Sequence, residues 1–468
     1  MKNLLANILI CPSCKFTGAD NLMAGSQKCS RCHTEFFDLL GLSCHFPSGK
    51  VQKYLWEDLL AKFITEMAGQ KKAHLENLAG YHQTRKTKKR MEVMQEVRLK
   101  SQEGIIKILR DAGLSPKRRE EFSHFGTKGF TQYFELLLRD WGWQASTQAS
   151  EGELYREYED ENQYALGHLE AQLPETFKAK KILVIGSGAG RLSWDLHQYL
   201  KPNLTVALDS NPLLAFVSHA MVKLGKEYTL QEARLYPHAG LPQAHSWMLK
   251  DQSDAQTELR DSWVAMGADA WAAPFKDESF DLIVTPWFMD INGQDSKKTI
   301  AVVDRLIEPG GYCLNYGPFL YPEELPEDQK YTPDEIREFL QLCNFSLESE
   351  SFHRIPYTYS PLNERGRIEE VWAFLAKMSD QKTHLDNAGE TSEPVYKHQP
   401  PPWLILPHLP IPQLTQPGLI PEDLKNISQL IDGNTSINAL AEMLNGKMPE
   451  GTTGEEFVYQ FLEAFILN

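Results

Sequence analysis

The chain has 468 residues and a formal net charge of −15, with 42% hydrophobic and 10% aromatic residues. This length suggests about three domains, and the composition is sufficient for hydrophobic cores. The acidic surface argues against a nucleic-acid partner, and the lack of an apolar run of about 18 residues argues against a membrane span. The start of the chain shows no cleavage site of a signal peptide, which favours a cytoplasmic protein.

The first 50 residues contain two pairs of cysteines. Cys11 and Cys14 are separated by two residues, as are Cys29 and Cys32, and 14 residues lie between the pairs. Four thiolates at this spacing can surround Zn²⁺ tetrahedrally, and a segment as short as 1–50 would gain much of its folding free energy from the metal. Disulfides are the alternative, which a cytosolic compartment disfavours. The spacing therefore predicts a zinc ribbon with a closed, structural site.

Residues 51–150 are predicted to be mostly helical, because apolar residues recur at helical spacing, for example from Val51 to Met67. A basic stretch runs from Arg85 to Lys100. It could contact phosphate or RNA, but glutamates interrupt it, so a solvated helix face is the simpler interpretation.

Between about residues 180 and 315, short apolar runs alternate with segments of helical periodicity. The exception is the segment 227–263, which shows little pattern and is interpreted as an insertion. Strands that alternate with helices at this spacing indicate parallel βαβ units, whose ligands bind at the carboxyl ends of the strands. The fold class is therefore predicted to be α/β with a Rossmann-like sheet. The predicted strands or strand ends are Lys181–Ile185, Leu204–Leu208, Gly267–Ala270, Phe280–Thr285 and a run that follows the turn Glu308–Gly311.

The first predicted strand is followed by the turn Gly186-Ser187-Gly188-Ala189-Gly190, which opens a helix. Glycines allow the backbone to bend tightly and to approach a ligand, and the free N–H groups of the helix start can bind it. Asp209 ends the second strand about 20 residues later, where a carboxylate can accept hydrogen bonds from the two hydroxyls of a ribose. These two signals together predict a nucleotide-type cofactor.

The order of these signals resembles the class I S-adenosylmethionine-dependent methyltransferases, which also carry an Asp-Ala-x-x-x-Pro-Phe segment and a Pro-Gly-Gly turn. The resemblance implies that the glycine turn cradles the methionine part, that Asp209 holds the ribose, and that Asp269 with Ala270 or Trp271 meets the adenine. A dehydrogenase, which the Pro-Gly-Gly turn disfavours, and a sheet that has lost catalysis are the alternatives. Further expected cofactor contacts in these motifs are Ser187, Gly188, Gly190, Arg191, Asn211 and Pro286.

Four segments resemble the carnosine N-methyltransferase family: Arg139-Asp140-Trp141, the loop Gly186–Asp195, Thr285–Asp290 and Asn315–Tyr321. In that family the arginine before Asp-Trp contacts the cofactor, which maps to Arg139, and the aspartate that closes the tail of strand four contacts the substrate, which maps to Asp290. The family has a histidine where this chain has Pro322, so carnosine itself is not expected as the substrate. The resemblance covers about residues 130–378, and the helical region before it is expected to cap the cofactor pocket.

The chemistry requires an unprotonated nitrogen held in line with the methyl group, away from water. Asp290 is the candidate catalytic residue, because a carboxylate there could orient the N–H of the acceptor; a helix N-cap is its alternative role. Asn315, Tyr321 and Tyr357 are further candidates for binding the substrate, although Tyr357 could equally pack at the edge of the sheet. We therefore expect N-methylation of a small acceptor that is histidine-like or derived from an amino acid.

The composition changes after residue 378, where a polar, proline-rich stretch precedes short extended and amphipathic patterns. The last region resembles winged-helix modules that bind leader peptides, but a docking or dimerisation module is the simpler interpretation. A peptide or protein methyltransferase with terminal recognition modules, or a non-catalytic adaptor, is therefore an alternative function. The predicted units are a zinc-ribbon-like segment 1–50, a helical cap 51–150, a methyltransferase domain 151–378, a linker 379–402 and a small C-terminal domain 403–468.

Overall fold

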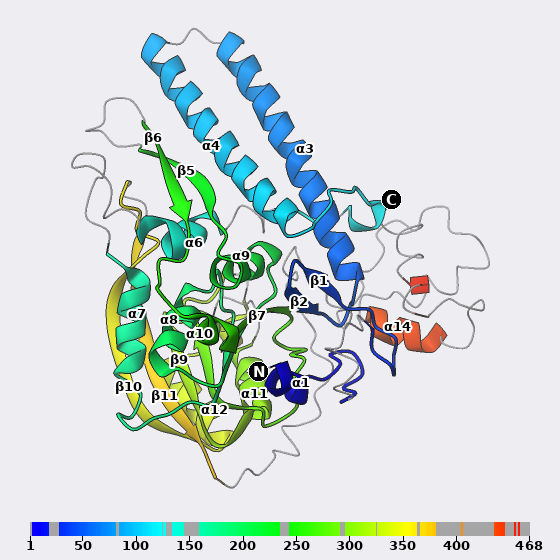
Figure 1. The fold of residues 1–468 in the computed structure, drawn as a ribbon, viewed down its shortest axis with the longest axis vertical. Helices are drawn as coiled ribbons and strands as arrows, with labels where there is room; N and C mark the ends of the chain where they lie inside the picture. The colour runs from blue at the N-terminus through cyan, green and yellow to red at the C-terminus, as the bar shows by residue number, and fades with distance from the viewer. Residues whose placement is uncertain are drawn as a thin grey trace.

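The computed structural model is an α/β molecule in which helices cover both faces of one large sheet, and two long helices project from the body (Figure 1). The Rossmann-like fold expected from the alternating pattern is confirmed by the strand order and the parallel pairing of the central strands. No helix in the part of the chain that the structure describes is both long and apolar enough to cross a membrane. The structure describes residues 2–17, 28–80, 84–123, 125–127, 133–144, 159–234, 243–290, 295–323, 325–362, 366–380, 404–405, 435–444, 454 and 457–458.

The main sheet contains nine strands in the order β1-β2-β7-β4-β3-β8-β9-β11-β10. Neighbours from β2 to β9 pair in parallel, whereas β1, β11 and β10 pair antiparallel at the two edges. The central strands are buried on both faces, which explains their continuous apolar sequence. The bounds are β1 Phe37–Leu39, β2 Leu42–His45, β3 Lys181–Ile185, β4 Leu204–Asp209, β7 Trp263–Ala268, β8 Phe280–Pro286, β9 Ile307–Gly317, β10 Phe345–Tyr357 and β11 Arg367–Met378.

The described parts of the segment 227–263, residues 227–234 and 243–263, contain regular elements, although the sequence shows little pattern. It contains β5 (Tyr228–Arg234) and β6 (Gln243–Leu249), which form a separate antiparallel ribbon, and the short helix α10 (Thr257–Ser262). The next parallel strand of the main sheet, β7, then begins at Trp263, earlier than the candidate strand end suggested. Tertiary packing of this strand between β2 and β4 decides its extent, which local periodicity could not reveal.

Alternate side chains of the central strands face two different helical layers. Leu183 and Ile185 pack in a core with α1, α11 and α12, whereas Ile182 and Val184 pack in a core with α7 and α8. The carboxyl ends of the parallel strands are left free of both layers, and the loops that follow them meet at this edge. The helices are α1 Lys2–Ile8, α7 Glu161–Glu170, α8 Arg191–Leu200, α9 Pro212–Val222, α11 Ser296–Leu306 and α12 Pro333–Leu342.

The N-terminal segment extends the main sheet. β2 pairs in parallel with β7, and Cys44 lies opposite Gly267 in this register. A Cβ at Gly267 would lie 2.8 Å from the Sγ of Cys44, so glycine permits the close approach of the two strands. Upstream of β2, the backbone N–H of Ile10 donates to the carbonyl oxygen of Pro274 at 2.9 Å. The segment therefore braces the loop that follows β7.

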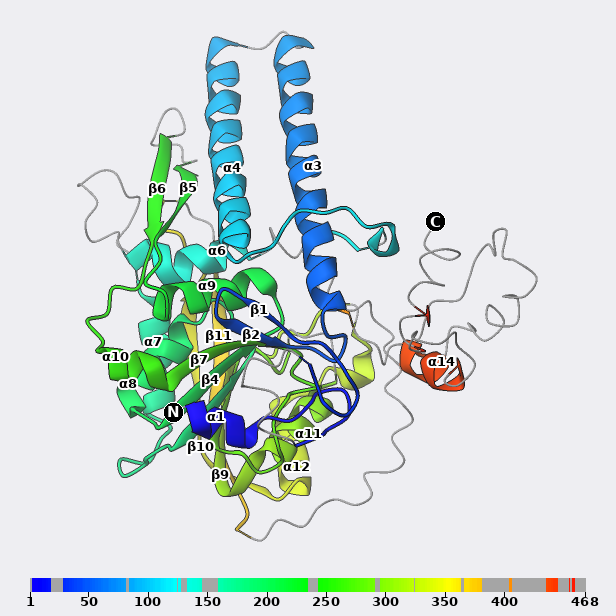
Figure 2. The same ribbon diagram turned by 45° about the vertical axis from the view of Figure 1, so that its right-hand side comes forward.

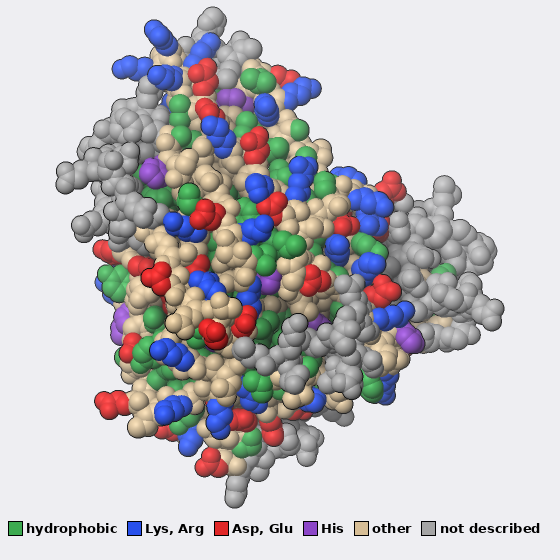
Figure 3. Space-filling view, viewed as in Figure 1, with side chains coloured by type: hydrophobic (Ala, Val, Ile, Leu, Met, Phe, Trp, Pro, Cys, Tyr) green, Lys and Arg blue, Asp and Glu red, His purple; other side chains and the backbone are tan. Residues whose placement is uncertain are grey.

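Two long helices, α3 (Val51–Gly80) and α4 (Arg85–Asp111), lie side by side and project from the body (Figures 1 and 2). Lys and Arg side chains are exposed around their far end (Figure 3). Helices were expected in 51–150, and the described residues of this pair pack partly in the same core as α9. The elements that reach the carboxyl ends of the strands are the short helix α6 (Phe134–Leu137) and the wide helical turn Leu138–Gly142.

Most of the C-terminal part lies outside the described residues. This applies to the expected linker 379–402 from residue 381 onward and to most of 403–468, including the winged-helix interpretation. Helix α14 (Ile437–Leu444) is described. Leu404 and Ile405 are also described, and they pack in the hydrophobic core beside α3 and α9.

Candidate functional site

The turn between β3 and α8 holds three glycines in the left-handed region, with φ of +68° at Gly186, +58° at Gly188 and +91° at Gly190. Two of them have no room for a side chain, because an added Cβ would lie 2.5 Å from Cδ2 of Phe288 at Gly186 and 2.3 Å from Cβ of Ser218 at Gly190. At Gly188 an added Cβ meets no atom of the other described residues within 4 Å. The turn therefore presents bare backbone to a space that a ligand can enter.

Asp209, at the end of β4, fixes this turn. Its Oδ2 accepts a hydrogen bond from the N–H of Gly188 at 2.9 Å, and its Oδ1 accepts one from the N–H of Asn211 at 2.8 Å. Asn211 in turn caps α9, where its Oδ1 accepts from the N–H groups of Leu213 and Leu214 at 3.0 and 3.2 Å. Burial raises the pKa of Asp209 to about 6. One carboxylate thus ties the glycine turn to the start of the next helix.

Three buried polar atoms near the turn have no hydrogen-bond partner among the described residues: Oγ of Ser187, Oδ2 of Asp269 and Nε1 of Trp271. Asp269 directly follows β7, and burial raises its pKa to about 6. Its Oδ1 accepts from the N–H of Trp271 at 3.1 Å, and the Trp271 ring stacks on Phe288 with centroids 5.6 Å apart. Unpaired buried donors and acceptors are costly. An adenosine group, which carries both donors and acceptors, fits this set.

These elements enclose a cavity of about 180 Å³ at the carboxyl ends of β3, β4, β7 and β8. The structure brings together in its wall the predicted residues Arg139, Gly186, Ser187, Gly188, Asp209, Asn211, Ala270, Pro286 and Tyr357. Sequence reasoning did not identify several other residues of the wall, namely Tyr133, Leu136, Trp287, Phe288 and Leu404.

Arg139 reaches the cavity from the wide helical turn after α6. It is largely buried, and its Nε donates to Oδ1 of Asp140 at 2.7 Å. The guanidinium carbon lies 5.7 Å from the ring centroid of Trp287 and 5.6 Å from that of Tyr357. Nε1 of Trp287 donates to Oε2 of Glu369 at 2.8 Å, which fixes this ring. The guanidinium of Arg139 and the aromatic rings of Trp287 and Tyr357 therefore form one side of the cavity.

The buried carboxylate of Glu161, which the sequence analysis did not identify, stabilises the backbone next to Tyr357 on this side of the cavity. Glu161, in the first turn of α7, accepts hydrogen bonds from the N–H groups of Thr358 and Tyr359, both at 2.8 Å. Burial raises the pKa of Glu161 to about 7. Thr358 has a φ of +48°, so the chain turns sharply directly after Tyr357, and the carboxylate stabilises that turn. An acid in the first turn of a helix is a common feature, which is why it gave no functional signal.

Asp290, the candidate catalytic residue, does not line the cavity. It is buried in the loop after β8, and its Oδ2 accepts a hydrogen bond from the N–H of Leu320 at 2.8 Å. The alternative role as the N-cap of the next helix falls to Asp295, which caps α11. Asp290 thus connects the loops after β8 and β9, and its catalytic role stays a prediction.

Five other predicted residues also lie outside the cavity wall, namely Gly190, Arg191, Asp269, Asn315 and Tyr321. Nε of Arg191 donates to Oδ2 of Asp195 at 2.6 Å within α8. Asn315 is buried in the sheet, where its Oδ1 accepts from Oγ1 of Thr285 at 3.0 Å. Tyr321 is half-buried beside the start of α11. Their contacts are structural in this conformation, and their roles in binding stay predictions.

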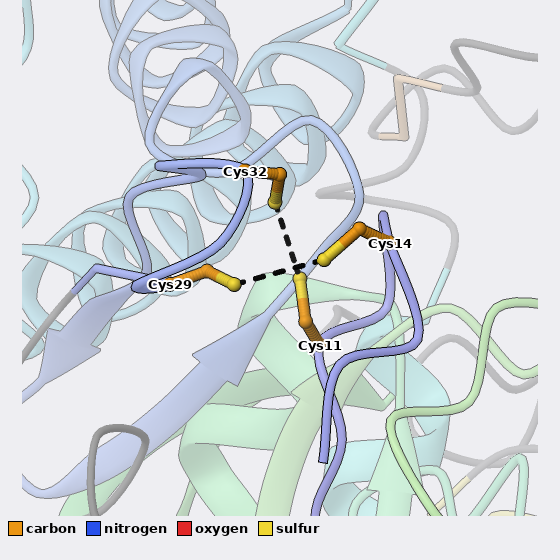
Figure 4. Close-up of side chains that lie close together, drawn as sticks. All are labelled: Cys11, Cys14, Cys29 and Cys32. Carbon is orange, nitrogen blue, oxygen red and sulfur yellow. Dashed lines mark hydrogen bonds between the residues drawn. The ribbon is translucent and has the colours of Figure 1, made fainter. Parts of the chain in front are cut away.

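The four N-terminal cysteines form a compact cluster, in which the sulfur atoms point toward one another from two loops (Figure 4). The Sγ atoms of Cys11 and Cys32 lie 3.6 Å apart, those of Cys14 and Cys29 lie 3.7 Å apart, and all four lie within 4.8 Å of one another. A tetrahedral Zn²⁺ with Zn–S bonds of about 2.3 Å separates its sulfurs by about 3.8 Å. All four thiols are free of disulfides, so the cluster is compatible with a zinc ion.

Several solved structures are similar to this chain, and no curated protein matches it. A methyltransferase from Methanosarcina mazei is 15% identical, with 46% of this chain and 97% of that chain covered and a TM-score of 0.30. Magnesium protoporphyrin IX methyltransferase from Synechocystis, solved with bound S-adenosylmethionine, is 12% identical, with coverages of 47% and 78% and a TM-score of 0.29. The N-methyltransferase NodS from Bradyrhizobium japonicum, in complex with S-adenosylhomocysteine, is 10% identical, with coverages of 50% and 97% and a TM-score of 0.31.

The sequence model of the carnosine N-methyltransferase family matches residues 127–367, which is just over half of the chain. The matched segment contains the glycine turn, the acids after β4 and β7, and the side of the cavity formed by Arg139 and Tyr357. The chain therefore belongs to the carnosine N-methyltransferase family and is an S-adenosylmethionine-dependent methyltransferase.

Proposed function

We propose that this enzyme methylates a nitrogen atom of a small acceptor that is histidine-like or derived from an amino acid. The observation that carries the proposal is the cavity at the strand ends, where the glycine turn, Asp209 and the unpaired polar atoms of Ser187 and Trp271 adjoin one space. Membership of a family named for N-methylation supports nitrogen as the acceptor atom.

The proposal assigns a role to each part of the wall around the cofactor. S-adenosylmethionine, when bound, supplies an electrophilic methyl group on a sulfonium. The backbone at Gly186–Gly188 would contact the methionine part of the cofactor. The carboxylate of that part would form an ion pair with the guanidinium of Arg139. Asp209 would accept hydrogen bonds from the ribose, and Asp269 with Trp271 would pair with the adenine. The aromatic rings of the wall exclude water and offer π faces to positive charge.

On the acceptor side, the chain must hold a neutral nitrogen in line with the methyl carbon. As the new N–C bond forms and the C–S bond breaks, S-adenosylhomocysteine leaves, and the nitrogen, now positively charged, releases its proton to solvent. We assign the orientation of the acceptor N–H to Asp290, which requires that the segment around Leu320 yields access to the carboxylate. Pro322 stands where the family has a histidine, so the acceptor would differ from carnosine.

We also infer that the cysteine cluster binds one structural Zn²⁺. Four thiolates leave no open coordination position, so the ion would act by holding the two loops together. Its folding contribution would be large, because the loops around it are short. Reduced, metal-bound cysteines agree with a cytoplasmic location, which we propose for the enzyme.

Incubation with S-adenosylmethionine labelled in its methyl group tests the proposed acceptor class. The panel consists of imidazole dipeptides, free amino acids and a cell extract that is separated into small-molecule, peptide and protein fractions. We expect labelled product among the small molecules, with the methyl group on nitrogen by mass spectrometry, and none with an Asp209→Ala control. Label in the peptide or protein fraction alone would contradict the small acceptor. Cofactor binding without any product would favour a non-catalytic role.

A further inference from the structure

One residue of the C-terminal region, Leu404, lines the cavity, although it and its neighbour Ile405 lie outside the family match at 127–367. Leu404 and Ile405 are only 1% and 4% exposed. Leu404 lines the cavity, as do Tyr133 and Leu214, which belong to or pack on the same hydrophobic cluster. The wall is therefore completed by a part of the chain that follows the methyltransferase domain.

A buried hydrogen bond fixes this segment. The N–H of Ile405 donates to Oε1 of Gln52 at 2.9 Å. Gln52 is fully buried in the first turn of α3, and its Oε1 also accepts from Oγ of Ser48 at 3.4 Å. A buried backbone N–H without a partner is costly, so this bond favours one position for Leu404 over alternatives. The N-terminal helix thus positions a C-terminal residue at the cavity.

The position of Leu404 indicates which part of the cofactor it would meet. Leu214 lies in the first turn of α9, close to its cap Asn211, and both line the same cavity as Asp209. Leu404 belongs to the same hydrophobic cluster as Leu214, and we take it to face the side of the cavity that we assign to the ribose and adenine. An aliphatic side chain on this side gains binding free energy by removing an apolar face of the nucleoside from water.

We propose that Leu404 is a cofactor-binding residue and that Gln52 positions it through Ile405. The inference rests on the proposed function, because it takes the cavity to be the cofactor site. According to this inference, cofactor affinity depends on the C-terminal region. The segment that matches the family would form an incomplete cofactor site without that region.

Calorimetric titration of the full-length chain with S-adenosylhomocysteine tests this role. Leu404→Ala removes most of the side chain, and we expect the Kd to rise about fivefold. Leu404→Met conserves the volume and should bind within about twofold of the wild type. Ile405→Pro removes the N–H that donates a hydrogen bond to Gln52, and it should raise the Kd for S-adenosylhomocysteine by a factor similar to that of Leu404→Ala. Met443→Ala, at an exposed position of α14, is the matched control and should leave the Kd unchanged.

The outcomes separate this inference from the function on which it rests. A wild-type chain that does not bind S-adenosylhomocysteine overturns the proposed cofactor site. Normal wild-type binding, together with an unchanged Kd in Leu404→Ala, overturns the role of Leu404 alone. Thermal unfolding without ligand is measured for each variant. A lowered Tm with an unchanged Kd would show that Leu404 only packs in the core, and this result also contradicts the inference.

Discussion

The variants Gly188→Ala and Gly190→Ala, in the same turn, test the cofactor site, because the first should affect ligand binding and the second mainly packing. Gly188 has a φ of +58°, where alanine costs about 1–2 kcal/mol, but its added Cβ meets no atom of the residues that the structure describes within 4 Å. The fold should survive while the methyl group occupies space in the cavity. At Gly190 the added Cβ would lie 2.3 Å from Cβ of Ser218, so α8 and α9 must move apart. Overpacking of this kind adds about 1–3 kcal/mol to the backbone strain.

The assay combines thermal unfolding, followed by circular dichroism, with calorimetric titration of S-adenosylhomocysteine. For Gly188→Ala we expect a Tm lower by about 2–8 °C and a Kd raised at least about tenfold. For Gly190→Ala we expect a larger loss of Tm, and weak binding as its consequence. Wild-type affinity in Gly188→Ala would refute the reasoning, because the turn would then not contact the ligand. An unchanged Tm in Gly190→Ala would refute the packing argument.

Three further predictions follow from the charged and metal-binding residues. Burial raises the pKa of Asp209 and Asp269 to about 6, so the Kd for S-adenosylhomocysteine should rise below pH 6 as both carboxylates lose their acceptor role; a Kd that is flat from pH 5 to 8 contradicts this. Because both pKa values are raised in the folded state, protonation of the two carboxylates increases the free energy of unfolding of the ligand-free protein as the pH falls from about 6 to about 4. Cys29→Ser should remove the zinc detected by native mass spectrometry and weaken cofactor binding, because the N-terminal segment braces the loop after β7. Asp290→Asn should lower kcat at least about tenfold without a change in cofactor Kd, and unchanged turnover would exclude its catalytic role.

The central part of the site follows from local signals in the sequence. Gly186–Gly190 and Asp209 each lie directly at the end of a buried strand, so the parallel sheet alone brings them to one edge. The cysteine spacing likewise defines its own cluster, because the two loops are short. What the spacing could not show is that Leu42–His45 would join the central sheet, since four residues carry too little pattern.

Other parts of the site depend on contacts between distant segments. Leu404 follows a proline-rich stretch, and its anchor through Ile405 to Gln52 spans most of the chain. No periodicity connects such residues. Asp290 shows a similar limit, because the resemblance placed it near the acceptor, whereas the packing of the loops after β8 and β9 buries its carboxylate against the N–H of Leu320. Positions in loops are set by tertiary contacts that the local sequence does not encode.

A crystal structure of the full-length chain with S-adenosylhomocysteine is the most direct measurement of the central claim. We expect the nucleoside at the ends of β3, β4 and β7, with its ribose hydroxyls within hydrogen-bond distance of Asp209 and its adenine beside Trp271. A nucleoside bound elsewhere, or a crystal at saturating ligand in which this cavity stays empty, contradicts the account.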